Sequence, residues 1–505
     1  MTFVRRNVHE LGQPWADELL WYARGVKAMK ARPLADPTSW TFYGAIHGIH
    51  RGLWNFYGIT QPGDPDPSQA DQDTYWNQCQ HGSWYFLPWH RGYVLALEAN
   101  VRSEIGKLGG PVDTWALPYW NYFKTGQNGL PDEFASPDWP DGTGDNPLFV
   151  VQRWGDGPGL PIVLDLSLIN LSAMGLTDFT GTANGGSPGF GGVDTGFAHG
   201  GAVHGGIETQ PHDFVHGLIG GGDPNDPRLP GLMSTPPAAA LDPIFWLHHA
   251  NIDRLWASWV NETGVGGDPT DARWLNGPAS IGERAFTLPM PDGTAWTYTP
   301  GEMRDMAALD YEYDDLTPDG AAMLVAAQAG ARAGTARGGM MAMAADTKTT
   351  ELLGANTGAL PISGDTATRT AVRMAPEPRA RSRSAFAAAG PEGGAEKVFL
   401  NLENVRGLAD AAAFKVYVGL PEGARPADHP DHMAGGVALF GVSQATEAEG
   451  EHAGSGLTYV LDITPIVTRL GLDTDKLHVD IVPVRPIAKE AEVSVGRVSV
   501  YRQGE

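Results

Sequence analysis

Histidines are the residues of this chain whose number and spacing point most directly to chemistry. Ten of the fifteen histidines lie between positions 47 and 249. His212 and His216 are four residues apart, so on a helix they would project from one face, one turn apart. His248 and His249 lie within an apolar stretch, where a buried imidazole needs a hydrogen-bond partner or a metal ion. The pattern indicates a metal site built from imidazoles.

A further pair, His81 and His90, can join this site. Pro88 separates them and breaks any continuous helix, so His81 falls on a loop and His90 on the first turn of the next helix, where the two can converge. Imidazole suits both copper and zinc, but a dinuclear hydrolytic zinc site normally includes carboxylates. No Asp or Glu repeats with the required spacing near these histidines. The ligand type therefore favours two three-histidine copper sites over two zinc ions.

Helices must position these side chains, and the clearest predicted one is Leu241–Val260. Asp242 suits its N-cap and Pro243 its first helical position. Its apolar residues cover most of the circumference, which is typical of a central, buried helix. Helical patterns also cover Glu10–Lys30 and Trp89–Lys107.

Between residues 125 and 206 the sequence predicts loops, because glycine and proline are dense there. Gly181–Gly206 is the extreme case, with little capacity for helix or sheet. It contains His199 and His204, which we predict to be solvated loop residues.

The chain is expected to form two domains, since 505 residues exceed what one core normally holds. Residues 1–318 predict a mainly α domain. Residues 319–345, rich in Ala, Gly and Met, predict a linker. Residues 346–505 contain short alternating β-type runs and predict an all-β C-terminal sandwich.

Charge and cysteine content exclude several classes of protein. The formal charge of −24 argues against nucleic acid or anionic membranes as partners. The single cysteine, Cys79, excludes an intramolecular disulfide. The first residues include two arginines but no apolar segment of a signal peptide, so a cytoplasmic location is expected, with export alongside a helper protein as the alternative. The sequence leaves the oligomeric state open, a homo-oligomer included.

Two long segments resemble a known family. Cys79–Arg91, CQHGSWYFLPWHR, is similar to the first copper-site signature of the tyrosinase and polyphenol oxidase family, and Asp242–Trp256, DPIFWLHHANIDRLW, is similar to the second. Pro211–His216 lies between them, as in that family. The resemblance covers residues 1 to about 318. The C-terminal part is more weakly similar to the β-sandwich that follows the catalytic domain in plant enzymes and molluscan haemocyanins.

The resemblance implies a type-3 dicopper centre inside a four-helix bundle, with two copper ions as cofactor and O2 as co-substrate. The ligands it implies are His47, His81 and His90 for the first copper and His212, His216 and His249 for the second. His47 is chosen because Gly44–Gly48 is similar to the family's pattern at that ligand, and His50 is the alternative.

The resemblance also implies roles for residues next to these histidines. Cys79 is expected to form a thioether bond with His81, although a small apolar filler is the alternative. Phe245 lies four residues before His249 and is expected to be the substrate gate over the second copper, with plain core packing as the alternative.

Acidic residues near the second ligand pair complete the predicted site. Glu208 is similar to a glutamate that holds a water near the coppers, where a carboxylate could accept a phenol proton. Asp213 stands where relatives with strong monophenol hydroxylation often have Asn, which puts the strength of that activity in question. The residues expected to line the site or orient its ligands are His248, Asn251, Asp253 and Arg254, although Asp253 and Arg254 could form only a structural ion pair.

Tyr311–Tyr313 is similar to the tyrosine motif that closes the catalytic domain in this family, where Arg5 or Arg6 would pack against it.

The implied function is copper-dependent oxidation of phenols by O2, namely ortho-hydroxylation of monophenols and oxidation of o-diphenols to o-quinones, latent until the C-terminal domain is displaced. The alternatives are an o-diphenol or o-aminophenol oxidase with little monophenolase activity, a haemocyanin-like oxygen carrier and a zinc-loaded structural or hydrolytic protein.

Overall fold

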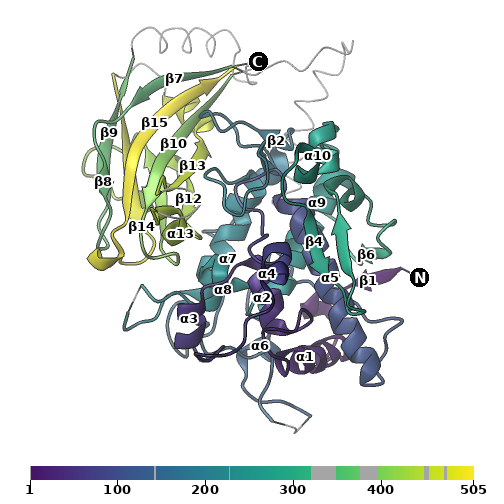
Figure 1. The fold of residues 1–505 in the computed structure, drawn as a ribbon. Helices are drawn as coiled ribbons and strands as arrows, with labels where there is room; N and C mark the ends of the chain where they lie inside the picture. Colours follow the sequence, from purple (N-terminus) through teal and green to yellow (C-terminus); the bar gives the residue numbers. More distant parts are fainter. Residues whose placement is uncertain are drawn as a thin grey trace.

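The computed structural model describes residues 2–141, 144–226, 228–319, 349–375, 396–448, 454–470 and 475–504. A helical N-terminal part and a β-rich C-terminal part lie side by side (Figure 1). The predicted order of a mainly α domain followed by an all-β domain is confirmed. Apart from Asp319, the predicted linker 319–345 lies outside the described residues. Within those residues, no helix has both the length and the apolar character needed to cross a bilayer.

Ten helices are described in the N-terminal part. They are α1 (Asp17–Lys30), α2 (Trp40–His47), α3 (Arg51–Phe56), α4 (Gln69–Tyr75), α5 (Phe86–Lys107), α6 (Asp132–Ala135), α7 (Phe214–Gly220), α8 (Pro236–Ala239), α9 (Ile244–Asn261) and α10 (Ala272–Asn276). Long α5 packs between α1 and α9. Every residue of α9 from Ile244 to Trp259 is buried, as its apolar circumference predicts.

The starts of two predicted helices differ from expectation. Helix α9 begins at Ile244 and not earlier, because Asp242 uses its carboxylate to accept the backbone N–H of Ile244 at 3.1 Å, which leaves Pro243 at the cap. The pattern over Glu10–Lys30 begins as helix only at Asp17. Such boundaries depend on single capping contacts that periodicity does not report.

Three short strand pairs are described in this part. Strand β1 (Phe3–Arg5) pairs in parallel with β6 (Tyr311–Tyr313), and β2 (Thr180–Gly181) pairs in parallel with β3 (Gly192–Val193). Strands β4 (Phe286–Pro289) and β5 (Ala295–Tyr298) form an antiparallel pair. The first pair brings the start of the chain against the end of the helical part.

Arg5, and not Arg6, is the arginine that packs against the tyrosine motif. Its buried guanidinium lies 4.2 Å from the ring centroid of Tyr311 and donates to the Tyr313 hydroxyl at 2.9 Å. It also pairs with Glu98 on α5 at 2.7 Å and with Asp253 on α9 at 3.3 Å. These contacts tie β1, α5, α9 and β6 together.

Arg5→Ala is expected to lower the free energy of unfolding by about 3–5 kcal/mol, because it leaves the buried Glu98 carboxylate without its closest cation. Arg6→Ala is the matched control, since the Arg6 side chain is 45 % exposed and its partner Glu18 27 % exposed, and the loss there should stay below about 1 kcal/mol. Urea unfolding followed by tryptophan fluorescence measures both. Equal losses for the two variants would contradict the role of Arg5.

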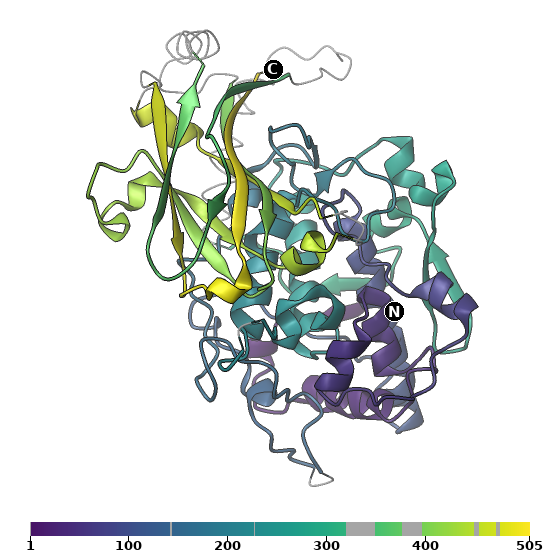
Figure 2. The same cartoon turned by 60° about the vertical axis from the view of Figure 1, so that its left-hand side comes forward.

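In the described residues of the C-terminal part, the strands form one antiparallel sheet, accompanied by two short helices. Its strands are β7 (Thr350–Ala355), β8 (Leu360–Pro361), β9 (Thr368–Met374), β10 (Lys397–Arg406), β11 (Ala413–Val418), β12 (Met433–Ala438), β13 (Leu457–Asp462), β14 (Lys476–Pro483) and β15 (Ser494–Gln503), and its helices are α13 (Val442–Thr446) and α14 (Thr464–Leu470). The hydrogen-bonded order is β12-β11-β14-β9-β7-β15-β10-β13, with β8 on β15. The end strands β12 and β13 also contact each other, so the sheet is nearly closed (Figure 2).

Several contacts hold the two parts together. The backbone N–H of Thr458 donates to the carbonyl of Ala202 at 2.7 Å. Arg485 donates to the carbonyl of Gly155 at 3.0 Å and forms an ion pair with Asp156. Residues just after β12 enter the helical part, and these bear on the site below.

Candidate metal centre

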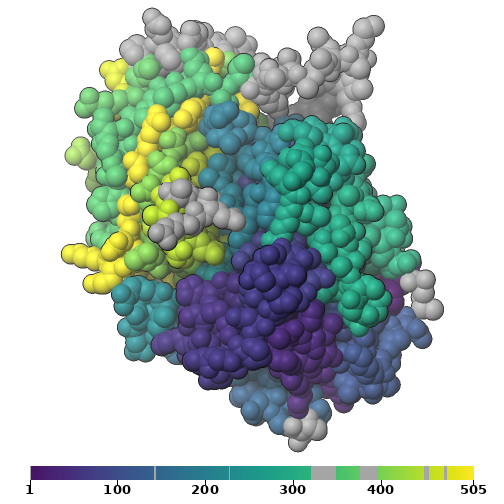
Figure 3. All heavy atoms as spheres, in the orientation of Figure 1, coloured from purple at the N-terminus to yellow at the C-terminus, as the bar shows by residue number. Residues whose placement is uncertain are grey.

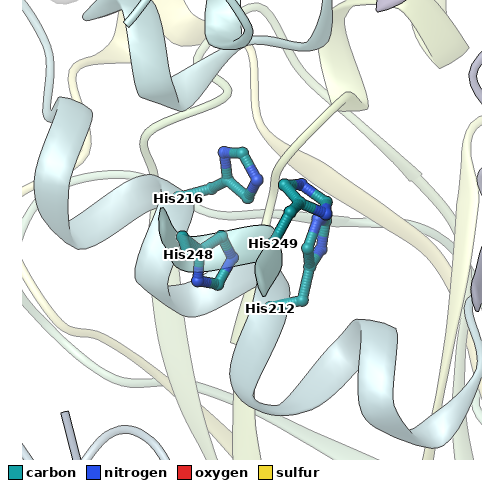
Figure 4. A group of neighbouring side chains, drawn as sticks. All are labelled: His212, His216, His248 and His249. Atoms are coloured by element: carbon teal, nitrogen blue, oxygen red, sulfur yellow. The ribbon is translucent and has the colours of Figure 1, made fainter. Parts of the chain in front are cut away.

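Five helical elements and the loop that carries His81 bring the predicted histidines together. His47 ends α2, His90 lies in the first turns of α5, and His216 lies on α7. His212 lies on the wide helical turn Glu208–Asp213 that precedes α7. The adjacent histidines lie on α9, and Figure 4 shows the rings of His212, His216, His248 and His249 gathered between these elements.

The first group consists of His47, His81 and His90. The Nε2 atoms of His47 and His81 are 3.4 Å apart, and the ring of His90 lies 5.3 Å from that of His81 and 5.7 Å from that of His47. His50 is exposed and caps α3, where its Nδ1 accepts the N–H of Leu53 at 2.9 Å. The structure therefore brings His47 to the site, and not His50.

The second group lies directly beside the first. The ring of His212 is 4.5 Å from that of His216 and 5.0 Å from that of His249. The ring of His249 also stacks on that of His90 at 4.3 Å, so the two groups are in direct contact. Nitrogens of His212, His216, His248 and His249 all lie within 4.8 Å of one another, a spacing at which they could hold a metal ion.

Hydrogen bonds fix which nitrogen of each ring is available. The Nδ1 atoms of three rings donate to backbone carbonyls at 2.7–2.8 Å: His47 to Pro236, His90 to Phe86 and His216 to Met233. A carbonyl can only accept, so the lone pair of each ring is on Nε2. The Nε2 atoms of His90, His212, His216 and His249 are buried and have no hydrogen-bond partner among the described residues. In His90, His212 and His216 the opposite nitrogen is held by a hydrogen bond, which is the arrangement typical of metal-ligating histidines.

The charge state of the rings also suits metal binding. Burial lowers the pKa of all six proposed ligands well below the ordinary value of histidine, the six being His47, His81, His90, His212, His216 and His249. The imidazoles are therefore neutral at physiological pH, and a neutral imidazole is the form that binds a metal.

The two adjacent histidines on α9 differ in their surroundings. The Nδ1 of His248 lies 3.3 Å from the hydroxyl of Tyr122. Neither nitrogen of His249 has a hydrogen-bond partner among the described residues, and its ring faces the first group through His90. The assignment of His249 as the ligand and His248 as its neighbour stays a prediction.

Glu208 is completely buried and holds His81 in place. One of its oxygens lies 2.7 Å from Nδ1 of His81, and both accept the N–H of Gly82 at 3.0 Å. The carboxylate thus lies on the side of the ring opposite Nε2. A role in accepting a phenol proton stays a prediction.

Asp213 and His204 continue this hydrogen-bonded set. One oxygen of Asp213 accepts from Nδ1 of His212 at 2.9 Å, and the other accepts from Nδ1 of His204 at 2.8 Å. Burial disfavours a charged His204, but the carboxylates of Glu208 and Asp213 outweigh it and raise the pKa of His204 to about 9. His204 therefore carries a positive charge that partly neutralises the two acids.

The prediction that His199 and His204 are solvated was wrong. His204 is 6 % exposed, and the Nδ1 of His199 lies 3.3 Å from Sγ of Cys79. The cause is the glycine content of their loop, which lets two backbones meet. Gly82 has a φ of 57°, and a Cβ built on it would lie 2.4 Å from the backbone of Gly201, so only glycine fits at this crossing.

Cys79 lies next to the first group. Its sulfur and the ligating nitrogens of His47 and His81 are all within 4.8 Å of one another. This placement is compatible with the predicted thioether bond to His81, which stays a prediction.

Residues Asn251, Asp253 and Arg254 act on the site only at a distance. Asp253 pairs with Arg91 on α5 and accepts from the hydroxyl of Tyr311 at 2.7 Å, so it anchors α9 and touches no ligand histidine. Arg254 donates to the carbonyls of Asp315 and Thr317, and Asn251 lies beside Tyr122. Asp253 does form structural ion pairs, which was the alternative interpretation of this residue. Its partners are Arg91 and Arg5, however, and not Arg254.

A cavity of about 260 Å³ lies where the two parts meet, against the first histidine group. From the helical part it is lined by Ile49, Asn77, His81, His199, Gly200, Gly201, His204 and Pro236, and from the C-terminal part by Phe440, Gly441, Gln444, Glu447 and Leu457.

Phe245 is fully buried between the two histidine groups, with its ring 4.2 Å from His249 and 5.0 Å from His47. Phe245 is not among the residues that line this cavity, whereas Pro236 and Phe440 are, and the role of Phe245 as the substrate gate stays a prediction.

Phe440 was not identified from the sequence. It follows β12, reaches into the helical part and stacks on the ring of His216 with a centroid distance of 4.2 Å. Its ring also lies 5.7 Å from that of His81 and 5.6 Å from that of His212. The C-terminal part, green to yellow in Figure 3, abuts the N-terminal part, and none of the six proposed ligands is more than 4 % exposed.

Comparisons with known proteins agree with this geometry. Residues 37–156 and 170–262 match the family model described as the common central domain of tyrosinase, and residues 349–503 match a domain of unknown function. The chain is 32 % identical to a tyrosinase of Hahella sp. (strain CCB-MM4) over 99 % of both chains. It is 29 % identical to a chloroplastic polyphenol oxidase of Malus domestica, over 54 % of this chain and 43 % of that one.

Solved structures share the arrangement of both parts. A latent aurone synthase (polyphenol oxidase) superposes with a TM-score of 0.60 at 20 % identity, over 100 % of this chain and 90 % of that one. A latent apple tyrosinase superposes with a TM-score of 0.59 at 22 % identity, over 99 % and 97 %. The full-length similarity to a bacterial tyrosinase and the two facing groups of neutral histidines lead to one conclusion: this chain belongs to the tyrosinase family, the dicopper oxidoreductases that use O2.

Proposed function

We propose that this chain is a latent phenol oxidase, which hydroxylates monophenols at the ortho position and oxidises o-diphenols to o-quinones. The observation that carries the proposal is the ring of Phe440, stacked at 4.2 Å and 27° on His216. The phenylalanine ring is the ring of a phenol without its hydroxyl. The place it occupies therefore accepts a flat aromatic ring against an imidazole, and a phenol of the same size fits once Phe440 leaves.

The protein orients the histidine ligands, keeps water out of the buried site and supplies acid–base groups. When bound, the two copper ions supply O2 binding and the redox change. Backbone carbonyls fix the rings of His47, His90 and His216, so little reorganisation is needed during the reaction. The buried Glu208 and Asp213, with His204 between them, form an acid–base set directly behind the ligand histidines His81 and His212, and in this proposal they take up or return the proton of the phenol.

A second candidate is an o-diphenol oxidase with little monophenolase activity. Its support is Asp213, whose two oxygens are both taken by histidine Nδ1 atoms. Glu208 is similarly occupied by His81 and the N–H of Gly82. Burial raises the pKa of both carboxyl groups, but their oxygens already accept these hydrogen bonds and are not aimed at an entering hydroxyl. Hydroxylation of a monophenol depends on removing its only hydroxyl proton.

The test is to cut the copper-loaded protein between its two parts and compare substrates. The sequence offers Arg332 and Arg337 there to a trypsin-like protease. Turnover of a small and a bulky o-diphenol, and of a monophenol, is measured before and after the cut. We expect all rates to rise and the bulky substrate to gain most.

Each other outcome has a distinct meaning. A rise for o-diphenols with no monophenol turnover would favour the second candidate. Reversible O2 binding without turnover, in both the cut and the uncut protein, would indicate an oxygen carrier. Equal rates before and after the cut would show that the C-terminal part is not a lid.

The predicted thioether has its own measurement. If Cys79 bonds to His81, copper loading in air should lower the intact mass by the hydrogens lost, and the denatured protein should show no titratable thiol. Cys79→Ser keeps the size of the side chain but cannot form the bond, so its mass should not change. A titratable thiol in the denatured, copper-loaded wild type would contradict the bond.

A further inference from the structure

Two histidines and an aspartate come together on the C-terminal part, away from the dicopper site. Ligating atoms of His429, Asp431 and His432 all lie within 4.8 Å of one another. The rings of the two histidines are 5.6 Å apart and perpendicular. None of these residues lines the cavity at the dicopper centre or contacts its histidines in the part of the chain described. The cluster needs its own explanation.

The local sequence explains why the two rings face one another. Pro430 opens a turn of 3₁₀ helix, Pro430–His432, which the N–H of His432 closes by donating to the carbonyl of His429 at 3.0 Å. In 3₁₀ geometry, residues three apart are eclipsed, so side chains at positions 429 and 432 lie on the same side. The turn leads directly into β12, which holds it against the sheet.

His432 has the features of a pre-formed ligand. Its Nδ1 donates to the carbonyl of Val418 at 2.8 Å, so the lone pair is on Nε2. Nε2 in turn lies 3.9 Å from Oδ2 of Asp431. His432 is 7 % exposed, and this arrangement repeats the one found for His47, His90 and His216 at the copper site.

Asp431 is also held in position. Arg469 on α14 donates to its carboxylate from Nη1 and to its backbone carbonyl from Nη2, both at 2.6 Å. The arginine reduces the negative charge that a cation would meet. A carboxylate has two oxygens with about four acceptor positions, however, so it can bind arginine and a metal ion together.

We propose that His429, Asp431 and His432 bind one divalent transition-metal ion of the Zn²⁺ or Cu²⁺ type. Two imidazoles and one carboxylate are the donor set that such ions prefer, whereas Mg²⁺ and Ca²⁺ prefer oxygen donors alone. Three protein ligands leave the remaining positions to water, so the ion is exchangeable. His429 is half-buried, which gives the ion a route from solvent.

The experiment uses the full-length protein, loaded with copper to two ions per chain and desalted so that the third site is free of copper, and then titrated with Zn²⁺ by calorimetry, with its copper content checked before and after. We expect one Zn²⁺ to bind per chain while both copper ions stay bound. Co²⁺ in place of Zn²⁺ should give visible absorption bands of a low-symmetry nitrogen and oxygen site.

Variants separate this site from other histidines. His429→Ala removes a half-buried ligand and should weaken Zn²⁺ binding by about tenfold or more. His478→Ala, which removes an exposed histidine on β14 of the same sheet, should leave it unchanged. Equal affinity of wild type and His429→Ala, or no Zn²⁺ bound to the wild type, would overturn the proposal. Phenol turnover of His429→Ala should equal that of the wild type, so this test is independent of the proposed function.

Discussion

Replacing His249 with Ala is expected to remove one of the two copper ions and to abolish phenol oxidation. Both nitrogens of this ring lack a hydrogen-bond partner among the described residues, and the ring lies against His90, His212 and Phe245. Loss of a residue that only orients a ligand already costs about 10–100-fold in affinity or activity, so loss of a ligand should exceed about a hundredfold.

The neighbouring position provides the matched control. His248→Ala removes an imidazole of the same size from the same buried helix, but its Nδ1 faces the hydroxyl of Tyr122. We expect this variant to lose stability and to retain both copper ions. The measurement is copper per chain by atomic absorption after desalting, together with o-diphenol turnover. Full copper occupancy in His249→Ala, or loss of one copper in His248→Ala, would reverse the assignment.

The site histidines were predictable because their geometry is local. His212 and His216 are one helical turn apart, and Asp242 and Pro243 mark the start of the helix that carries His249. Each of these relations spans a few residues, so the sequence pattern contains it. The choice of His47 over His50 came from resemblance alone, and its physical reason became visible only in the cap that His50 makes on α3.

The acidic set behind the histidines was only half predictable. Glu208 and Asp213 lie next to a ligand pair in sequence, which drew attention to them. His204 joins them because the glycine-rich loop folds back across Gly82, and that crossing depends on a contact between residues more than a hundred positions apart. A buried loop of this kind requires glycines at both crossing points. The high glycine content of the loop therefore indicates the crossing, although from the sequence alone it predicts a solvent-exposed loop.

Phe440 could not be found from the sequence because nothing local marks it. More than two hundred residues separate it from His216, and its own neighbourhood is a β-strand and a short helix like many others. Which residue of the C-terminal part enters the site depends on how the two parts pack, through contacts such as Thr458 with Ala202 and Arg485 with Gly155.

Phe440→Ala in the uncut chain is expected to activate the enzyme without proteolysis. Truncating a buried phenylalanine removes about 3–5 kcal/mol of packing free energy, and about 1.4 kcal/mol corresponds to a factor of ten. The ring of Phe440 is 1 % exposed and stacks on His216, so most of that energy favours the closed state. We therefore expect kcat/KM for an o-diphenol to rise by about tenfold or more.

Gln444→Ala is the control for this prediction, because Gln444 lines the same cavity from α13 but has no ring against a histidine. It should leave the rate of the uncut chain within about twofold of the wild type, as expected for a residue whose loss changes the free energy by less than about 0.5 kcal/mol.

After the chain is cut between its two parts, wild type, Phe440→Ala and Gln444→Ala should all reach the same rate, since the catalytic residues are identical. If cutting activates the wild type while Phe440→Ala stays as slow as the uncut wild type, the closed state does not depend on Phe440, and the contacts of Arg485 and Thr458 must hold the lid in place. If Phe440→Ala is already as fast as the cut enzyme, a single aromatic ring accounts for latency.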